Sequence, residues 1–442
     1  MNFKIKLLPL LYLLILFSSI TYNPHQHEKS FDDIRSEYVS GIKKLNLPVL
    51  QLNFKENILA DNSMELINMQ LAFFKKSNEA LGSVKIPGLD SNESADYDLM
   101  KYQIDFNIER LELESETYGK RSSIAGAESI YEIPNGKGWY QYFLKRWLGD
   151  NVSSEEIYQL GLEEIKRSQQ NIEAIRRKLG LTEDKFYEKL NDSSFFLHDE
   201  AAIKKDFEQI KETVFSNIQN IFLNYNIPVI GIKNGTNAEL SQTPGYYSEN
   251  VFYFNLFGKP YNKRQMDWLF IHEAVPGHHF QTSIATGVDR SEVQQLFWYP
   301  GYAEGWAAYT EEYGDELGLY KTPYEELGRW EWDIVRSVRV VLDVAINYYG
   351  WNDRQALDFW KKNIRNQDDI AMREINRIKR WPVQVITYKY GASQFLTWKK
   401  KMQLKEGVSF NIRNFHNKLL KRGGLPFVLL RKYLDHDLVN ES

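Results

Sequence analysis

Hydrophobic and polar residues recur with the period of an α-helix along most of this 442-residue chain. The clearest example is the segment 151–180, where apolar side chains stand at helical intervals at Ile157, Leu160, Ile165 and Ile172. Ser153 and Glu156 have the spacing of a capping box at its start, and Gly180 favours a helix end. We therefore predict one long amphipathic helix over this segment.

The same pattern, interrupted by proline and glycine, predicts further helices before and after this one. They cover residues 31–45, 62–81, 94–117, 137–148, 199–224, 324–349, 353–363, 367–380, 383–405 and 409–421. Two segments differ because they are rich in β-branched and aromatic residues and are flanked by turn residues, namely 227–234 and 248–258. The pattern thus predicts a mainly α protein with one small β-sheet, placed just before the helix that follows residue 258.

The first residues have the pattern of an export signal. Lys4 and Lys6 precede the apolar run 7–20, which is too short to span a bilayer comfortably. We predict a signal peptide over 1–22, a helical lobe over 23–225 and a catalytic lobe over 226–442, packed as one globular unit. Export would place the chain in the periplasm or outside the cell without stable membrane insertion. An uncleaved signal that serves as a membrane anchor is the alternative.

Composition narrows the classes of function. Hydrophobic residues make up 43% and charged residues 26%, which is typical of a globular protein. The net charge of −4 argues against a nucleic-acid partner, because such proteins neutralise phosphates with surplus positive charge. The chain has no cysteine, so disulfides, thiolate ligands and cysteine catalysis are excluded. Any metal site must therefore use histidine, aspartate or glutamate.

The candidate chemistry centres on HEAVPGHH, residues 272–279. It resembles the helical zinc motif HExxH, but His278 follows His272 by six residues, or about 240° around a regular helix. Pro276 and Gly277 predict a bulge or kink that would return His278 to the face of His272. His279 is the alternative second imidazole, although it lies about 10 Å along a straight helix.

A catalytic zinc site needs a third protein ligand and an open coordination position. Glu304 offers this ligand in YPGYAEGWAAYTEEYGDELG, residues 299–318, where Pro300 and Gly301 precede a helical pattern. Small residues after Glu304 would allow that helix to pack closely against the first. The order and spacing of both motifs favour a metal site over a histidine-rich surface turn.

These motifs resemble the bacterial "domain of unknown function 885" family, whose hallmarks are HEAxPGHHxQ and EGWAxYxE. The chain has HEAVPGHHFQ at 272–281 and EGWAAYTE at 304–311. The resemblance extends over most of 240–435, through PGYYSEN (244–250), RSVRVVLDVAINYYGW (336–351), EINRIKRWPVQVITYKYG (374–391) and GGLPFVLL (423–430). It implies a helical zincin-like metallopeptidase fold. It also implies one zinc ion held by His272, His278 and Glu304, with Glu273 as the general base.

The resemblance singles out three further residues. Tyr388 matches a family tyrosine that could donate to the developing oxyanion, or it is a core residue. Arg377 matches a family arginine that could bind a substrate carboxylate, or it pairs with a helix acid such as Glu374. Gln281 either orients a ligand histidine or faces solvent. In addition, the strand VFYFNLF at 251–257 is a candidate for binding substrate along its edge.

Two segments depart from the family pattern. DVAIN at 343–347 replaces DTGIH, so Asn347 stands where the family has histidine, and PVQ at 382–384 replaces PGQ. Neither departure touches the expected ligands or base, although a lost substrate-binding histidine would alter specificity. The sequence therefore predicts an exported zinc-dependent hydrolase, a peptidase acting on peptides. The alternatives are a metal-dependent amidase for a non-peptide amide and a non-enzymatic binding protein on the same scaffold.

Overall fold

The computed structural model describes residues 29–60 and 63–440, so the predicted signal peptide lies outside the described residues. The predicted mainly helical architecture with small sheets is confirmed. The helices are α1 (Phe31–Leu45), α2 (Phe54–Ile58), α3 (Met64–Gly82), α4 (Ser91–Thr117), α5 (Arg121–Gly126), α6 (Gly136–Leu148), α7 (Ser154–Lys178), α8 (Glu183–Lys189), α9 (Glu200–Asn217), α10 (Met266–Glu273), α11 (His278–Gly287), α12 (Glu292–Gln295), α13 (Pro300–Thr310), α14 (Pro323–Asn347), α15 (Asp353–Asn363), α16 (Asp368–Arg380), α17 (Thr387–Glu406), α18 (Ile412–Lys421) and α19 (Phe427–Asn440).

Local sequence determines most helix starts. The predicted capping box is confirmed: the Ser153 hydroxyl accepts a hydrogen bond from the Glu156 N–H, and the Glu156 carboxylate accepts one from the Ser153 N–H. Several predicted helix bounds differ from the structure, and two of them differ by four residues or more. The helix expected over 199–224 ends as α9 at Asn217, and the helix expected from 383 begins as α17 at Thr387 after a 3₁₀ turn. Among the described residues, no helix is long and apolar enough to cross a membrane.

The strands are short and form two sheets. They are β1 (Phe196–Leu197), β2 (Gly231–Asn234), β3 (Gly245–Ser248), β4 (Val251–Phe254) and β5 (Tyr261–Asn262). In the three-stranded sheet, β4 lies between β2, which is parallel to it, and β3, which is antiparallel. The prediction that the strand at 251–257 offers an edge to substrate is wrong, because both edges of β4 are already paired. The edge strands of this sheet are β2 and β3.

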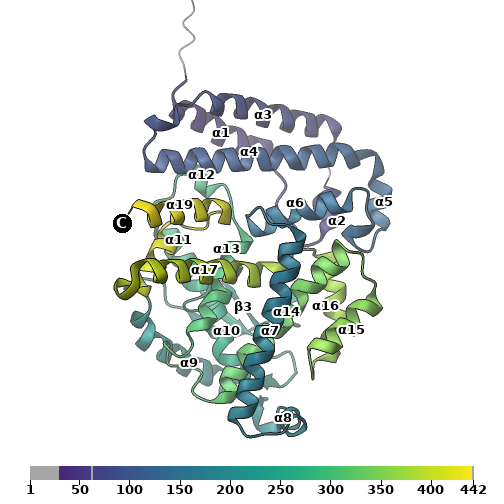
Figure 1. Cartoon of the computed structure of the whole chain (residues 1–442), viewed down its shortest axis with the longest axis vertical. Coiled ribbons are helices and arrows are strands. Elements are labelled where there is room, and N and C mark those ends of the chain that lie inside the picture. The colour runs from purple at the N-terminus through teal and green to yellow at the C-terminus, as the bar shows by residue number, and fades with distance from the viewer. Residues whose placement is uncertain (1–28, 61–62, 441–442) are drawn as a thin grey trace, which may run out of the picture.

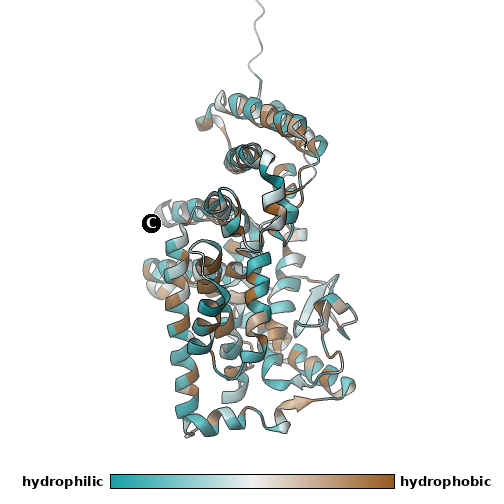
Figure 2. Cartoon of the chain, turned by 90° about the vertical axis from the view of Figure 1, so that its right-hand side faces the viewer, coloured by the Kyte–Doolittle hydropathy of each residue, from teal (hydrophilic) through white to brown (hydrophobic). Residues whose placement is uncertain are grey.

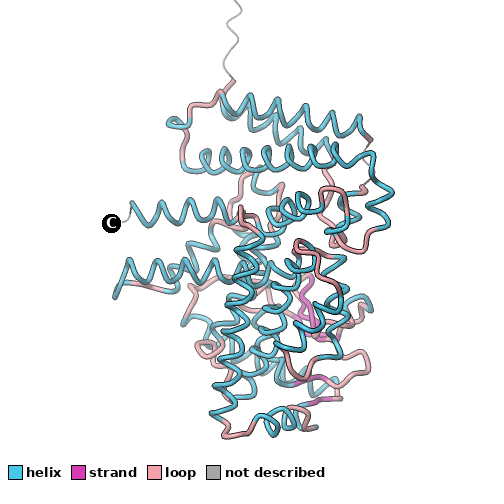
Figure 3. The backbone as a smooth tube through the Cα atoms, turned by 45° about the vertical axis from the view of Figure 1, so that its right-hand side comes forward, coloured by secondary structure: helices cyan, strands magenta, loops and turns pink. Residues whose placement is uncertain are grey.

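Helix α14 lies at the centre of the structure and packs along α7 (Figure 1). Helices α1, α3 and α4 form a layer at one end, and the strands lie on one side of the helical body (Figures 1 and 3). Coloured by hydropathy, the helices carry both brown and teal along their length (Figure 2), as amphipathic helices do. Their apolar residues form one large buried cluster that extends through the described chain.

Helices α13 and α17 approach each other closely because glycines face each other at their crossing. A Cβ atom placed on Gly305 would lie 2.4 Å from Gly391 Cα, and one placed on Gly391 would lie 2.5 Å from Gly305 Cα. No side chain fits in that space. This contact places Glu304 on α13 and Tyr388 on α17 beside the same cavity.

Candidate metal centre

The HEAVPGHH segment breaks into two helices instead of forming one kinked helix. Helix α10 ends at Glu273 and α11 begins at His278, with four non-helical residues between them. The prediction of a bulge within one helix is therefore wrong, although it located the irregularity correctly. A Cβ atom at Gly277 would lie 1.8 Å from the carbonyl oxygen of His272, so the chain folds back on α10 where only glycine fits.

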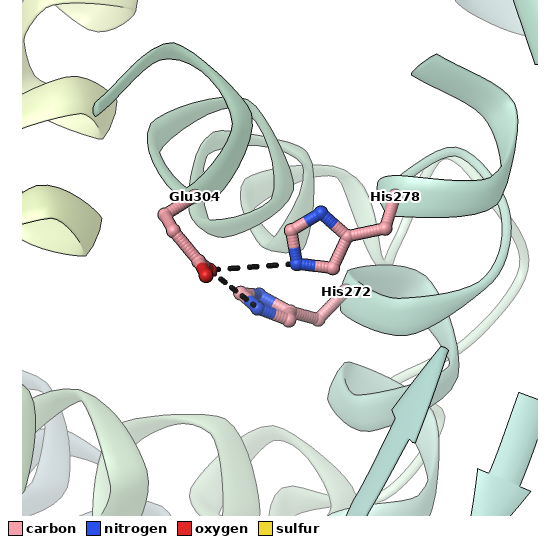
Figure 4. Close-up of side chains that lie close together, drawn as sticks. All are labelled: His272, His278 and Glu304. Atoms are coloured by element: carbon pink, nitrogen blue, oxygen red, sulfur yellow. Dashed lines mark ion pairs between the residues drawn. The ribbon is translucent and has the colours of Figure 1, made fainter. Parts of the chain in front are cut away.

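This break brings His272, His278 and Glu304 together. The Glu304 Oε2 atom lies 3.7 Å from His272 Nε2 and 3.4 Å from His278 Nε2, and one ligand atom from each residue falls within 4.8 Å of the others. The two imidazole rings are nearly perpendicular, with their centroids 4.9 Å apart. Figure 4 shows both rings directed at the Glu304 carboxylate. The chain thus gathers two imidazole nitrogens and a carboxylate oxygen in one place.

His279, the alternative second imidazole, lies elsewhere. Its ring is fully buried, with Nε2 2.9 Å from the carbonyl oxygen of Pro228 and Nδ1 3.3 Å from the Tyr247 hydroxyl. Both ring nitrogens are therefore engaged away from Glu304. Of the two candidates, His278 is the one that joins His272 at the cluster.

A second carboxylate, from Glu311, holds the other side of His272. The His272 Nδ1 atom lies 2.8 Å from Glu311 Oε1, and the Arg336 guanidinium donates to the same oxygen at 2.6 Å. All three side chains are buried. A carboxylate on Nδ1 fixes the tautomer and leaves the Nε2 lone pair free for a metal, as at many metal sites.

The sequence reasoning missed Glu311, although the signal was present in EGWAAYTE. Glu304 and Glu311 are seven residues apart, which is close to two helical turns, and Glu311 directly follows the last residue of α13, so both carboxylates reach His272. An acid at that spacing from the expected glutamate ligand could have been predicted to lie next to the candidate site.

The electrostatics of the cluster favour a cation. Burial opposes the protonation of His272, but Glu304 and Glu311 raise the pKa of its imidazole to about 9. Burial likewise opposes ionisation of Glu304, yet His272 and His278 hold the pKa of its carboxyl well below the usual range. Burial raises the pKa of Glu273, an effect that both histidines oppose. The surplus of carboxylates therefore stabilises positive charge at the ring nitrogens.

The cluster opens into a cavity of about 550 Å³. Glu273, the expected general base, lines this cavity beside the three clustered residues. Tyr388 lines it too: its ring lies over His272 at 6.0 Å, and its hydroxyl accepts a hydrogen bond from Gln384 at 3.1 Å. Because that oxygen accepts from Gln384, its own proton remains available to donate.

Arg377 also lines the cavity, and it lies near the acid proposed as its alternative partner. Its Nη2 atom donates to Gln384 at 2.8 Å, and its Nη1 atom lies 3.8 Å from Glu374. Gln281 is buried and lines a different hollow, whose lining includes none of the three clustered residues. Neither alternative for Gln281 holds, because its side chain hydrogen-bonds with neither His272 nor His278 among the described residues and it does not face open solvent.

The two departures from the family pattern meet at one buried carboxylate. The Val383 N–H donates to Asp343 at 2.9 Å, and the Asn347 amide lies 3.5 Å from the same residue. Val383 has a φ of 72°, a conformation that favours the glycine of the family pattern. Asn347 is fully buried and does not line the cavity. Asparagine in place of the family histidine therefore changes the packing behind the cavity wall and not the residues that line the cavity.

Comparison with known proteins places the chain in a family. The profile described as "Bacterial protein of unknown function (DUF885)" matches residues 113–434. A solved "putative lipoprotein" from Colwellia psychrerythraea is 22% identical, with a TM-score of 0.66 over 93% of this chain and 74% of that chain. A "putative lipoprotein of unknown function" from Shewanella oneidensis is 16% identical, with a TM-score of 0.70 over 92% and 100%. At these identities the likeness shows a shared fold alone.

No curated protein matches the chain. The family profile, in contrast, covers most of the cavity wall and both motifs that contribute His272, His278 and Glu304. We call these three residues the metal cluster. The chain therefore belongs to the bacterial family of unknown function DUF885.

Proposed function

We propose that this protein is an exported zinc-dependent hydrolase, a peptidase that cleaves peptides, built on a zincin-like helical fold. The observation that carries the proposal is the convergence of His272, His278 and Glu304 on one point beside Glu273 in an open cavity. The "putative lipoprotein" description of both structural neighbours supports export. So does the apolar run that begins the sequence.

The residues present fit a zinc ion. Two imidazole nitrogens and one carboxylate oxygen form a typical ligand set of catalytic zinc, and the cavity leaves the remaining side open. Glu311 on His272 supplies the supporting carboxylate that such sites have. A zinc ion held by His272, His278 and Glu304 would polarise a substrate carbonyl and lower the pKa of water.

The side chains around the cluster supply proton transfer. Hydrolysis breaks an amide C–N bond, adds hydroxyl to the carbonyl carbon and adds a proton to the leaving nitrogen. The Glu273 carboxylate lines the cavity next to the ligands, where it can take a proton from the attacking water and pass it to the amine. The Tyr388 hydroxyl is oriented by Gln384 and can donate to the oxygen that gains charge.

Edge strand β3 supports a peptide substrate. Gly245, Tyr246 and Tyr247 of this strand line the same cavity, and β3 pairs with β4 on one edge. Its other edge can accept an extended peptide through main-chain hydrogen bonds. This feature favours a peptide over a compact non-peptide amide.

The first experiment is the zinc content of purified wild-type protein beside that of His272→Ala and Glu273→Gln. We expect about one zinc per chain in the wild type and in Glu273→Gln, and a loss of zinc in His272→Ala. Peptide-library cleavage should fall by several orders of magnitude in Glu273→Gln, because the base is absent while the metal stays.

Each other outcome points to a different function. If the zinc content depends on His272, and the protein cleaves small amides but no peptide, the protein is an amidase. Peptide binding without cleavage in either the wild type or Glu273→Gln would identify a binding protein. A wild-type protein that holds no metal after zinc is offered would overturn the proposed function.

A further inference from the structure

A cluster of arginines lines the same cavity next to Tyr388. Arg339 projects from α14, and Arg373 and Arg377 project from consecutive turns of one face of α16. Together with Glu374 they form what we call the arginine wall. None of these side chains is needed to hold the metal cluster, so their presence calls for a separate explanation.

The arginine wall has more positive than negative charge. Glu374 lies 3.0 Å from Arg339, 3.0 Å from Arg373 and 3.8 Å from Arg377, and it is the one carboxylate they contact within the described residues. Glu239 also lines the cavity but is exposed at its rim. Three guanidinium groups therefore share the single carboxylate of Glu374, and Arg339 is buried with it, where unbalanced charge is costly.

Two guanidiniums of the wall are only partly hydrogen-bonded within the described residues. The Nε atoms of Arg339 and Arg377 are buried and have no hydrogen-bond partner in the described part of the chain. Burial lowers the pKa of Arg339; Glu374 raises it in part, and the neighbouring Arg377 lowers it again. A guanidinium presents paired N–H groups that match the two oxygens of a carboxylate. The guanidiniums that line the cavity therefore suit an anion of that shape.

Aromatic rings keep the guanidiniums in position. Arg339 lies over the rings of Trp332 and Tyr388 at 5.6 and 5.9 Å, and Arg377 lies over Trp381 at 5.2 Å. Such cation–π contacts orient a cation without neutralising its charge. The guanidiniums of the wall are therefore preorganised for a ligand.

A chain of hydrogen bonds joins the arginine wall to the metal cluster. Arg377 donates to Gln384, Gln384 donates to Tyr388, and the Tyr388 ring lies over His272. An anion bound at Arg377 would thus sit beside the tyrosine proposed to stabilise the developing oxyanion. An anion there would therefore affect, through Gln384, the position of the Tyr388 hydroxyl next to the bond that is cleaved.

We propose that the arginine wall is a subsite for a carboxylate of the substrate, so the enzyme selects peptides with a carboxylate near the cleaved bond. This inference rests on the proposed hydrolase function. The Tyr388 ring lies about 6 Å from both His272 and Arg339. An extended peptide rises about 3.3–3.6 Å per residue, so about three residues or fewer cover the distance from His272 to Arg339. The carboxylate is either a free C-terminus or an acidic side chain.

The test measures peptide affinity in zinc-loaded Glu273→Gln protein, which binds without cleaving. Three N-acetylated tetrapeptides are titrated by calorimetry: a neutral peptide with a free C-terminal acid, its C-terminal amide, and the amide with one residue changed to glutamate. We expect a carboxylate-bearing peptide to bind about 10- to 100-fold more tightly than the neutral amide, as is usual for charge-assisted hydrogen bonds. The acid and the glutamate-containing amide distinguish the two sources.

Adding Arg377→Gln should lower the affinity of the carboxylate-bearing peptide about 10- to 100-fold, to that of the neutral amide in the same variant. Arg373→Gln, at a more exposed position, serves as a second variant and should reduce the preference in part. The matched control is Arg354→Gln, on the exposed face of α15. Equal affinity for all three peptides, or a preference that survives both wall substitutions, would overturn the subsite. Absence of zinc or of any cleavage by the wild type would instead overturn the proposed function.

Discussion

The metal cluster and the arginine wall line the same cavity with opposite surpluses of charge. Around His272, three carboxylates from Glu273, Glu304 and Glu311 face one guanidinium, that of Arg336. On the arginine wall, three guanidiniums share the carboxylate of Glu374. The two proposed ligands would balance these surpluses, a metal cation at the first and a substrate carboxylate at the second.

On the proposed function, this contrast lets one cavity hold the metal ion at one place and the substrate carboxylate at another. A cation at the cluster and a carboxylate at the wall would balance charges that the protein leaves unbalanced. The Tyr388 ring lies between them, near His272 and near Arg339. The most direct ways to test the comparison are therefore to alter the residue that joins the two regions, and then to alter each region in turn.

The largest effect should come from Tyr388→Phe, which removes the hydroxyl but keeps the ring between the two regions. We expect kcat for a cleaved peptide to fall about 100- to 1,000-fold, the usual loss when one oxyanion donor is removed. Zinc content should not change, because the tyrosine is not among the clustered ligands. Steady-state kinetics and metal analysis of the same preparation provide the measurement.

A matched control for that variant is Tyr349→Phe, whose hydroxyl binds Glu155 at the surface. This change removes the same atom from a tyrosine outside the cavity, and its kcat should equal that of the wild type. An unchanged kcat in Tyr388→Phe would show that the tyrosine only packs against His272. The two regions would then share a cavity without a chemical link between them.

The next effect should come from Glu311→Gln, which reduces the negative surplus of the metal cluster. The glutamine can still accept from His272 but no longer carries the charge that Arg336 contacts. We expect zinc affinity to fall about 10- to 100-fold, as is typical when a supporting carboxylate is lost. Competition with a chromophoric zinc chelator measures this change directly.

The same substitution on the other region, Glu374→Gln, sharpens the test. Glu374 is as deeply buried as Glu311 but contacts only the arginines of the wall among the described residues. Zinc affinity should therefore stay at the wild-type value in Glu374→Gln. An equal loss of zinc in both variants would mean that the cavity responds to total charge and not to two separate regions.

The two regions also differ in how far the sequence predicted them. His272, Glu273 and Glu304 lie in short motifs, and local chemistry around Pro276 and Gly277 located the irregularity between the histidines. Capping residues such as Ser153 likewise predicted helix starts, because a cap depends on neighbours within one turn. Information of this kind lies within a few residues of the feature it determines.

Other features depend on contacts between distant segments, which the sequence pattern does not encode. The strand at 251–254 became the centre of its sheet because β2 and β3 pair with it, and alternation alone does not reveal partners. The arginine wall combines α14 with α16, so only Arg377 was singled out beforehand. The choice of His278 over His279 needed the full break between α10 and α11.

The smallest effect concerns Asp343, a buried carboxyl group on α14. Unlike the carboxylates of the two regions, it has no cationic partner among the described residues. It accepts hydrogen bonds from the Tyr140 hydroxyl and the Val383 N–H, but no cation pairs with it in the described chain. Burial raises the pKa of Asp343 to about 7, although these hydrogen bonds oppose the rise. We predict that Asp343→Asn flattens the dependence of folding stability on pH.

The sign follows from proton linkage. An unfolded aspartate has a pKa of about 3.9, so between that value and about 7 the folded chain binds a proton that the unfolded chain has released. The contribution of Asp343 to the free energy of unfolding therefore falls as pH rises through this window, and it levels off above pH 7. Between pH 6 and pH 8 the wild type should lose about 1 kcal/mol more than Asp343→Asn in urea unfolding. The exposed Asp184→Asn should follow the wild type, and parallel curves for wild type and Asp343→Asn would show that Asp343 is already ionised in the folded chain.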